Sequence, residues 1–104
     1  MVKLNVFERL VLLQILPVEG DIASLKIVRE LQSKLGFTEG EFKEFELQKK
    51  DNTYVWNEKG RKEKEIMIGD KMNEIIIDSL KQLDKQKKLS FNHMNLYSKF
   101  IKEK

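Results

Sequence analysis

The chain has 104 residues, of which 40% are hydrophobic and 36% are charged, and it contains no cysteine. This length and composition indicate a single soluble globular domain over residues 1–104 and exclude a fold that depends on disulfide bonds. The apolar run at residues 11–16 is interrupted by Gln14 and is too short to cross a bilayer. No signal peptide is recognisable, so we expect a cytoplasmic protein.

The net charge of +3 is unevenly distributed along the chain. Residues 1–52 carry eight basic and nine acidic side chains, whereas residues 53–104 carry twelve basic and eight acidic ones. Lysine outnumbers arginine by 17 to 3, and arginine is the residue that bidentate recognition of phosphates or bases prefers. The charge pattern therefore favours a solvated surface over a dedicated DNA-binding domain.

A first helix is predicted over about residues 6–16. Asn5 and Glu8 have the spacing of a capping box at its start, and Pro17 ends it because the residue before a proline avoids helical geometry. Apolar residues surround nearly the whole helical cylinder, which is typical of a central helix covered on several sides.

Two more helices are predicted before the middle of the chain. Asp21 is placed to cap a helix over about residues 22–35. Thr38 and Glu41 then have the spacing of a second capping box, which starts a short helix. This short helix ends early, because the sequence begins to alternate near residue 45.

Three strands are predicted at residues 45–49, 53–57 and 64–68, and they form a three-stranded antiparallel meander. The KKDN turn joins the first two strands, and the loop around Gly60 joins the last two. A long helix over about residues 71–86 and a final helix from Ser90 complete the order ααα-βββ-αα. The prediction is an α+β fold, with helices packed on a small three-stranded antiparallel sheet.

The order of three helices followed by a hairpin also permits a winged-helix-like arrangement, in which the short third helix would read DNA. That helix reads EGEFKEFE and carries four glutamates against Lys43. Phosphates would repel it, so we do not expect it to enter a DNA groove.

No pattern of catalytic or cofactor-binding residues is recognisable. His93 is the single histidine, so histidine and cysteine cannot form a metal or redox cluster. The five glycines match no phosphate-binding motif, and no serine has an evident base beside it. The sequence predicts a protein that is not an enzyme and holds neither metal nor cofactor.

The segment YVWNEKGRKEKEIMI, residues 54–68, is the most suggestive candidate for a binding surface. Its loop EKGRKEKE has four basic and three acidic side chains, a mixture that a phosphate-binding loop would seldom contain. In a strand over residues 53–57, Tyr54 and Trp56 would share one face. That face is either part of the core or an exposed hot spot, because tyrosine and tryptophan are favoured anchors at interfaces.

The segments FERLVLLQILPVEGDIASLKIVRELQSKLGFTEGE and LKQLDKQKKLSFNHMNLYSKF resemble a family of small uncharacterised proteins encoded by bacteriophages and prophages. The resemblance extends from Val6 to Phe100 and consists of apolar spacing and turn residues such as Pro17 and Gly20. It implies a phage accessory protein in the cytoplasm of a bacterial host, and it supplies no site residues.

The leading hypothesis is a non-catalytic phage protein that acts by binding. It would inhibit a host protein, such as one of host defence, or sequester a small nucleotide ligand, and it could form a homo-oligomer. The candidate partner-binding residues are Tyr54, Trp56, Lys59, Arg61 and Lys62.

Two alternatives remain open from the sequence. One is a winged-helix-like protein that binds nucleic acid weakly, with an affinity that falls steeply with salt. The candidate residues for this binding are Lys64, Lys81, Lys85, Lys87 and Lys88. The other alternative is a minor structural or assembly protein of a virion.

Overall fold

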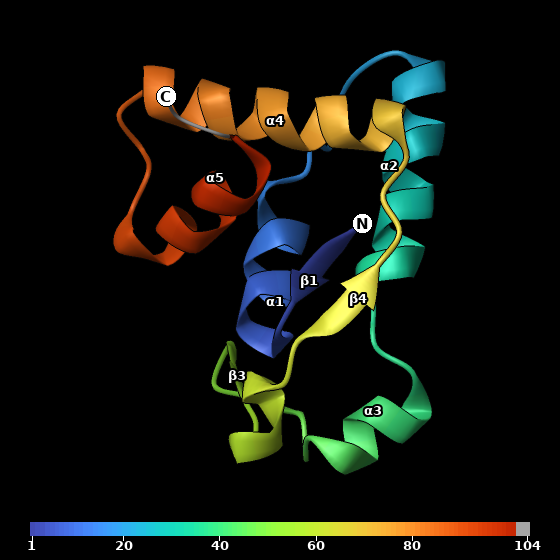
Figure 1. Ribbon diagram of the computed structural model, residues 1–104, viewed down its shortest axis with the longest axis vertical. Helices are drawn as coiled ribbons and strands as arrows, with labels where there is room; N and C mark the ends of the chain where they lie inside the picture. Colours follow the sequence, from blue (N-terminus) through green and yellow to red (C-terminus); the bar gives the residue numbers. More distant parts are fainter. Residues whose placement is uncertain (102–104) are drawn as a thin grey trace.

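The computed structural model describes residues 1–101 and has an α+β fold (Figure 1). Its α-helices are α1 (Val6–Ile15), α2 (Ile22–Leu35), α3 (Glu39–Glu44), α4 (Asp70–Lys85) and α5 (Met94–Phe100). Its strands are β1 (Val2–Leu4), β2 (Gln48–Lys50), β3 (Thr53–Val55) and β4 (Lys64–Ile66). Two short 3₁₀-helices, η1 (Glu58–Arg61) and η2 (Phe91–His93), precede β4 and α5.

The predicted three-stranded meander is wrong. The described strands form two separate antiparallel sheets of two strands each, β1 with β4 and β2 with β3. The unpredicted strand β1 pairs with β4, so that Val2 lies opposite Ile66 and Leu4 opposite Lys64. This pairing places the buried side chains of Leu4 and Ile66 in the main core, whereas β2 and β3 bury no side chain. Burial of apolar surface therefore favours β1 over the hairpin as the partner of β4.

The second and third predicted strands are shorter than expected, and the first begins later. Phe45 still belongs to the end of α3 and is buried, and Glu46 adopts a left-handed conformation with φ of 50°. These two residues close the helix, so β2 cannot begin before Gln48. β3 ends at Val55, so Trp56 lies outside the strand. The alternation of side chains along β3 therefore does not determine the side to which Trp56 points.

The main core surrounds α1, as the apolar periodicity of this helix predicts. Figure 1 shows α1 in the middle of the molecule, with α2, α4 and α5 around it. The buried residues of this core come from β1, β4 and four of the helices. They are Leu4, Val11, Leu12, Leu16, Val28, Leu31, Leu35, Ile66, Met72, Ile76, Leu80 and Leu96.

A second, smaller apolar cluster lies beside the N-terminal end of α1. Val6, Phe45 and Leu47 are its buried members, and Leu10, Phe37 and Trp56 pack against them. This cluster fastens α3 and the segment after the hairpin to α1. It thereby positions the lower part of the molecule in Figure 1, which contains α3, β3 and η1.

The helix starts follow the predicted capping signals. Capping boxes are present at Asn5 with Glu8 and at Thr38 with Glu41, and the Asp21 side chain accepts a hydrogen bond from the Ser24 amide. The order of a short α3 followed by a hairpin is confirmed, but the hairpin shares no sheet with β1 or β4. Among residues 1–101, no helix combines the length and the apolar character that crossing a bilayer requires.

Candidate functional site

The five candidate partner-binding residues lie in one continuous segment, from β3 to the residue after η1. Tyr54 belongs to β3 and is 39% exposed, whereas Trp56 follows the strand and is half-buried. Lys59 and Arg61 lie in η1, Lys62 follows it directly, and all three are exposed. The structure therefore places the five residues at one end of the molecule, the end that α3 also occupies (Figure 1).

The β2–β3 hairpin is exposed along its whole length. All six of its strand residues are exposed, and Lys49 lies directly opposite Tyr54. At its tip, Asp51 and Asn52 have φ values of 49° and 66°, the left-handed conformation that a two-residue hairpin turn requires. Aspartate and asparagine tolerate this conformation better than most residues. Because the hairpin contributes no buried side chain to the core, its side chains are open to contact with another molecule.

Trp56 packs at the base of the hairpin, so the two predicted aromatic residues differ in environment. The Trp56 ring lies 6.3 Å from the Phe7 ring, measured between centroids, and belongs to the smaller apolar cluster. A Cβ atom at residue 60 would collide with the indole, so Gly60 permits its close packing on η1. The face that Tyr54 and Trp56 were expected to share is divided, with Trp56 partly in the core and Tyr54 on the surface.

The exposed apolar side chains around Trp56 form what we call the hairpin surface, which consists of Phe7, Tyr54, Val55 and Trp56. Phe7, Tyr54 and Val55 are 38%, 39% and 40% exposed. Sequence reasoning missed Phe7, because apolar residues surround nearly the whole of α1 and the pattern does not show which of them stays exposed. Tyr54 and Val55 are successive residues of β3 and point to opposite sides of the strand, so the hairpin surface presents an apolar side chain on each side of it. Partly exposed aromatic side chains are favoured anchors at protein interfaces.

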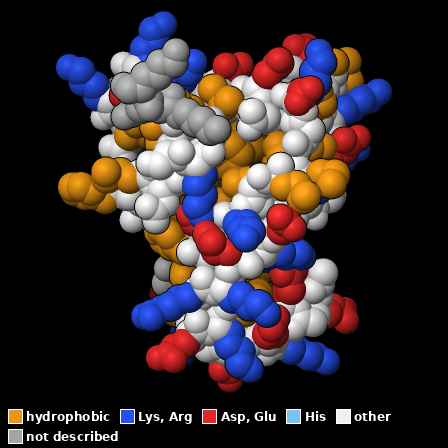
Figure 2. Space-filling model, viewed as in Figure 1, with side chains coloured by type: hydrophobic (Ala, Val, Ile, Leu, Met, Phe, Trp, Pro, Cys, Tyr) orange, Lys and Arg blue, Asp and Glu red, His pale blue; other side chains and the backbone are white. Residues whose placement is uncertain are grey.

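The charges around the hairpin surface are mixed. Residues 37–65, which contain α3, the hairpin and η1, carry seven basic and eight acidic side chains. Figure 2 shows the blue and red side chains interspersed over this lower part of the molecule. Such a surface has no excess of positive charge with which to attract a nucleic-acid backbone.

A buried arginine supports this end of the molecule from inside. Arg9 is 1% exposed and donates hydrogen bonds to the carbonyls of Leu35 and Gly36 and to both oxygens of Glu41. Its guanidinium also lies 4.0 Å from the centroid of the Phe37 ring. Arg9 thereby joins α1 to the end of α2 and to α3. The hydrogen bond from Arg9 outweighs the effect of burial and lowers the pKa of Glu41 to about 2.

A second ion-pair network links the two ends of the chain. The Lys99 ammonium lies 2.8 Å from Glu8 and 2.6 Å from Glu63, and it also donates to the carbonyl of Lys3. Burial alone would lower the pKa of Lys99, but its hydrogen bonds to Glu63 and Glu8 raise it overall. Sequence reasoning missed both networks. Two adjacent charges, Glu8 and Arg9, in a helix whose other residues are apolar except Gln14 were the signal that could have indicated them.

The alternative nucleic-acid residues lie at two distant places. Lys64 belongs to β4 and its ammonium lies 3.5 Å from the Glu41 carboxylate. The other four, all exposed, lie in the second half of α4 and just beyond it, at the opposite end of the molecule (Figure 1). They are Lys81, Lys85, Lys87 and Lys88. The structure therefore places Lys64 apart from the other four candidate residues.

Histidine, cysteine, aspartate and glutamate do not gather in a metal-binding group of three anywhere in residues 1–101. His93 lies at the start of α5, where its Nδ1 atom accepts a hydrogen bond from the Ser90 amide at 3.0 Å. The chain matches no protein-family model, no curated protein and no solved structure.

Proposed function

We propose that this protein is a non-catalytic binding protein whose hairpin surface docks on a partner protein. The observation that carries this proposal is the set of partly exposed apolar side chains at Phe7, Tyr54 and Val55, beside a hairpin that buries nothing in its own fold. Aromatic side chains of this kind provide much of the binding free energy in protein interfaces.

The packing behind the hairpin surface favours a preorganised interface. Trp56 is held between Phe7 and η1, and Asn57 donates through its side chain to the Glu44 carbonyl while its amide donates to the Phe45 carbonyl. These contacts fix the base of the hairpin to α3. Binding of a partner would therefore cost little conformational entropy in this surface, because its base is already ordered.

The ionisable groups with shifted pKa values favour a non-catalytic role. Glu41, Glu63 and Lys99 belong to the two ion-pair networks around Arg9 and Glu8 of α1, and the pKa of Asp21 is lowered by its hydrogen bonds from Ser24 at the start of α2. Perturbed groups at an active site would instead face a cleft where substrate can reach them. Here, the shifts have a structural cause.

The mixed charge of residues 37–65 favours a protein over a nucleic acid as the partner of this surface. The resemblance to phage-encoded proteins makes a bacterial host protein, such as one of host defence, the first partner class to test. A second copy of this chain is the competing protein partner, since an exposed hairpin can also pair with another hairpin.

The test begins with a photo-crosslinking amino acid placed at Tyr54 and, in a separate sample, at Ile22. Ile22 is 71% exposed at the start of α2 and is the matched control position. The partner that crosslinks at Tyr54 is then purified, and its affinity for the full chain is measured by calorimetry. The double substitution Tyr54→Ala with Val55→Ala should weaken binding by about thirtyfold, since an interface hot spot contributes about 2 kcal/mol.

The substitution Ile22→Ala should leave the affinity unchanged. The proposal is wrong if the purified partner binds the hairpin variant as tightly as the original chain, or if crosslinking at Ile22 equals that at Tyr54. A chain that crosslinks to itself and forms a large closed ring in light scattering would instead indicate an assembly protein.

A further inference from the structure

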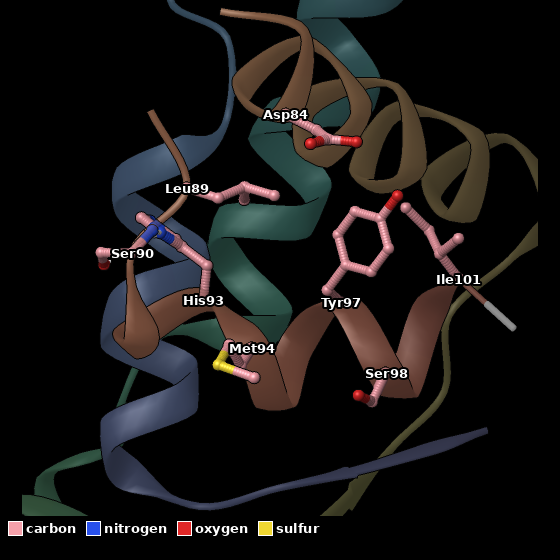
Figure 3. A pocket seen from close by; sticks show the side chains of 8 residues that line it. All are labelled: Asp84, Leu89, Ser90, His93, Met94, Tyr97, Ser98 and Ile101. Atoms are coloured by element: carbon pink, nitrogen blue, oxygen red, sulfur yellow. Dashed lines mark hydrogen bonds between the residues drawn. The ribbon is translucent and has the colours of Figure 1, made fainter. Parts of the chain in front are cut away.

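A cavity of about 650 Å³ lies at the end of the molecule away from the hairpin, between the last turns of α4 and α5 (Figure 3). Small-molecule sites commonly have volumes of this size and combine an apolar lining with a few polar groups. The side chains that line the cavity are Asp84, Leu89, Ser90, His93, Met94, Tyr97, Ser98 and Ile101.

The apolar part of the lining is suited to a flat ring. Figure 3 shows the Tyr97 ring rising from α5 towards α4, with Leu89 on one side and Ile101 on the other. Met94 is 57% exposed and lies one helical turn before Tyr97. An aromatic ring and a polarisable thioether provide a stacking surface for an aromatic ligand.

The polar part of the lining offers an acceptor and a donor. The Asp84 carboxylate has no hydrogen-bond or ion-pair partner within residues 1–101, and as an ionised group it can only accept hydrogen bonds. His93 accepts the Ser90 amide at Nδ1, so the neutral ring carries its proton on Nε2. Asp84 is exposed, so a ligand with an N–H group can reach its carboxylate from the cavity and donate to it.

The charge near the cavity favours a ligand that also carries an anionic group. Residues 81–101 contain five lysines against Asp84 alone, whereas residues 1–80 contain thirteen basic and fifteen acidic side chains. Lys99 is held by Glu8 and Glu63, but Lys81, Lys85, Lys87 and Lys88 are exposed on and directly after the last turns of α4. Lys85, Lys87 and Lys88 flank Asp84 and Leu89 of the lining in sequence, so this side of the cavity has an excess of positive charge.

We propose that this cavity binds a nucleotide: a nucleobase stacks on Tyr97, its exocyclic amine donates to Asp84, and its phosphate interacts with the lysines at the end of α4. An aromatic ring, an N–H donor and an anion occur together in this class of ligand. Stacking of a base on an aromatic side chain contributes about 1–3 kcal/mol. This site is separate from the hairpin surface and does not depend on the proposed protein partner.

The probe for the test is adenosine monophosphate, added to the full chain and followed by calorimetry and by the NMR signal of the Met94 methyl group. Two matched ligands dissect the contacts: adenosine lacks the phosphate, and purine riboside monophosphate lacks the exocyclic amine. We expect one site, with affinity for adenosine monophosphate at least tenfold higher than for either analogue.

Two variants and one control tie the binding to the cavity. Asp84→Ala should abolish the preference for the amine-bearing base, and it should not unfold the chain, because a carboxylate near a helix C-terminus is unfavourable. Replacement of Lys85 and Lys88 by Gln should abolish the preference for the phosphate. Asp78→Asn, at an exposed position of α4 outside the cavity, should change neither.

Three results would overturn the proposal. The first is no shift of the Met94 signal at millimolar adenosine monophosphate. The second is equal affinity for all three purine ligands. The third is binding of a simple apolar anion such as decanoate in place of the nucleotide, which would indicate that only the apolar wall and the lysines matter.

Discussion

The guanidinium of Arg9 and the carboxylate of Glu41 join two helices across 32 residues of chain, with hydrogen bonds of 2.7 and 3.2 Å. This two-point contact fixes both groups in one plane, which lysine could not do. The same carboxylate accepts the Thr38 amide at the start of α3. One side chain thus caps α3 and anchors it to the central helix.

The Arg9–Glu41 pair predicts a specific loss of stability in acid. The pKa of Glu41 is lowered from 4.5 to about 2 in the folded protein, chiefly by its hydrogen bond to Arg9. Because the folded value is the lower one, the stabilisation is present above about pH 4.5 and is lost as the pH falls towards 2. It amounts to about 3 kcal/mol. Chemical denaturation at several pH values should therefore show a decrease through this range.

The variant Glu41→Gln should remove most of that pH dependence and lower the free energy of unfolding at pH 7. Glu39→Gln is the control, because Glu39 lies in the same first turn of α3 but is exposed and has no ion pair among the described residues. If the free energy of unfolding of the two variants decreases equally between about pH 4.5 and pH 2, Glu41 does not contribute as inferred.

The Lys99 network predicts a second stability effect, this time at neutral pH. Lys99→Met would leave the Glu8 carboxylate, which is 3% exposed, without a cationic partner. Leaving a buried charge unpaired costs about 3–5 kcal/mol, and here the Asn5 amide still donates to Glu8, so we expect a loss of about 2–3 kcal/mol. Urea denaturation at pH 7 measures it.

Two further variants test whether the loss in Lys99→Met comes from the ion pair. Lys26→Met, at an exposed position of α2, should change the free energy of unfolding by less than about 0.5 kcal/mol. The double variant Lys99→Met with Glu8→Gln should recover part of the loss, because the buried charge is then removed. Without any recovery, packing of the lysine stem and not the ion pair would explain the cost.

The helices could be predicted from the sequence because their signals are local. The capping boxes at Asn5 and Thr38 lie within four residues of the helices they start, and the apolar pattern of α1 correctly indicated its central place. The start of α4 is the exception, since its N-cap residue is Gly69, which provides no side-chain hydrogen bond, and Asp70 is the first helical residue.

The sheets and the long-range contacts could not be predicted in this way. β1 has three residues and no turn beside it, and its partner β4 lies in the second half of the chain, so no local pattern indicates the pairing. Arg9 contacts Glu41, and Lys99 contacts Glu8, only because α3 and α5 pack near α1 in the folded chain. The cavity is lined by residues between Asp84 and Ile101, but it exists only because α5 folds back against α4, and no local pattern indicates that packing.

Gly60 provides a test of the packing that supports the hairpin surface. In Gly60→Ala, the new methyl group would collide with the Trp56 indole, and overpacking of this kind costs about 1–3 kcal/mol. Thermal unfolding and the fluorescence maximum of Trp56, the single tryptophan, should both change.

Gly69→Ala is the matched control for Gly60→Ala. A Cβ atom at Gly69 meets nothing within 4 Å, and the residue has a φ of −74°, which alanine adopts readily. Replacing the N-cap glycine by alanine should cost at most about 1 kcal/mol and leave the fluorescence unchanged. Equal effects of the two substitutions would contradict the close packing of Trp56 on η1.

The end of α4 predicts a substitution that stabilises the protein. Lys87 has a φ of 58°, and hydrogen bonds from the Lys88 amide to the Leu83 carbonyl and from the Lys87 amide to the Asp84 carbonyl close the helix in a Schellman motif. This left-handed position normally holds glycine, and a side chain with a Cβ is strained there by about 1–2 kcal/mol. Since glycine also loses more backbone entropy on folding, Lys87→Gly should stabilise by about 0.5–1 kcal/mol.

The matched control lies two residues earlier in the same helix. Lys85→Gly removes the same charge but places glycine at the last helical residue, where it should destabilise by up to about 1 kcal/mol. Opposite signs for the two glycine substitutions, measured by urea denaturation, would locate the strain at residue 87. Two losses of similar size would mean that the lysine charge near the helix C-terminus, which favours the native state through the helix dipole, outweighs the backbone strain.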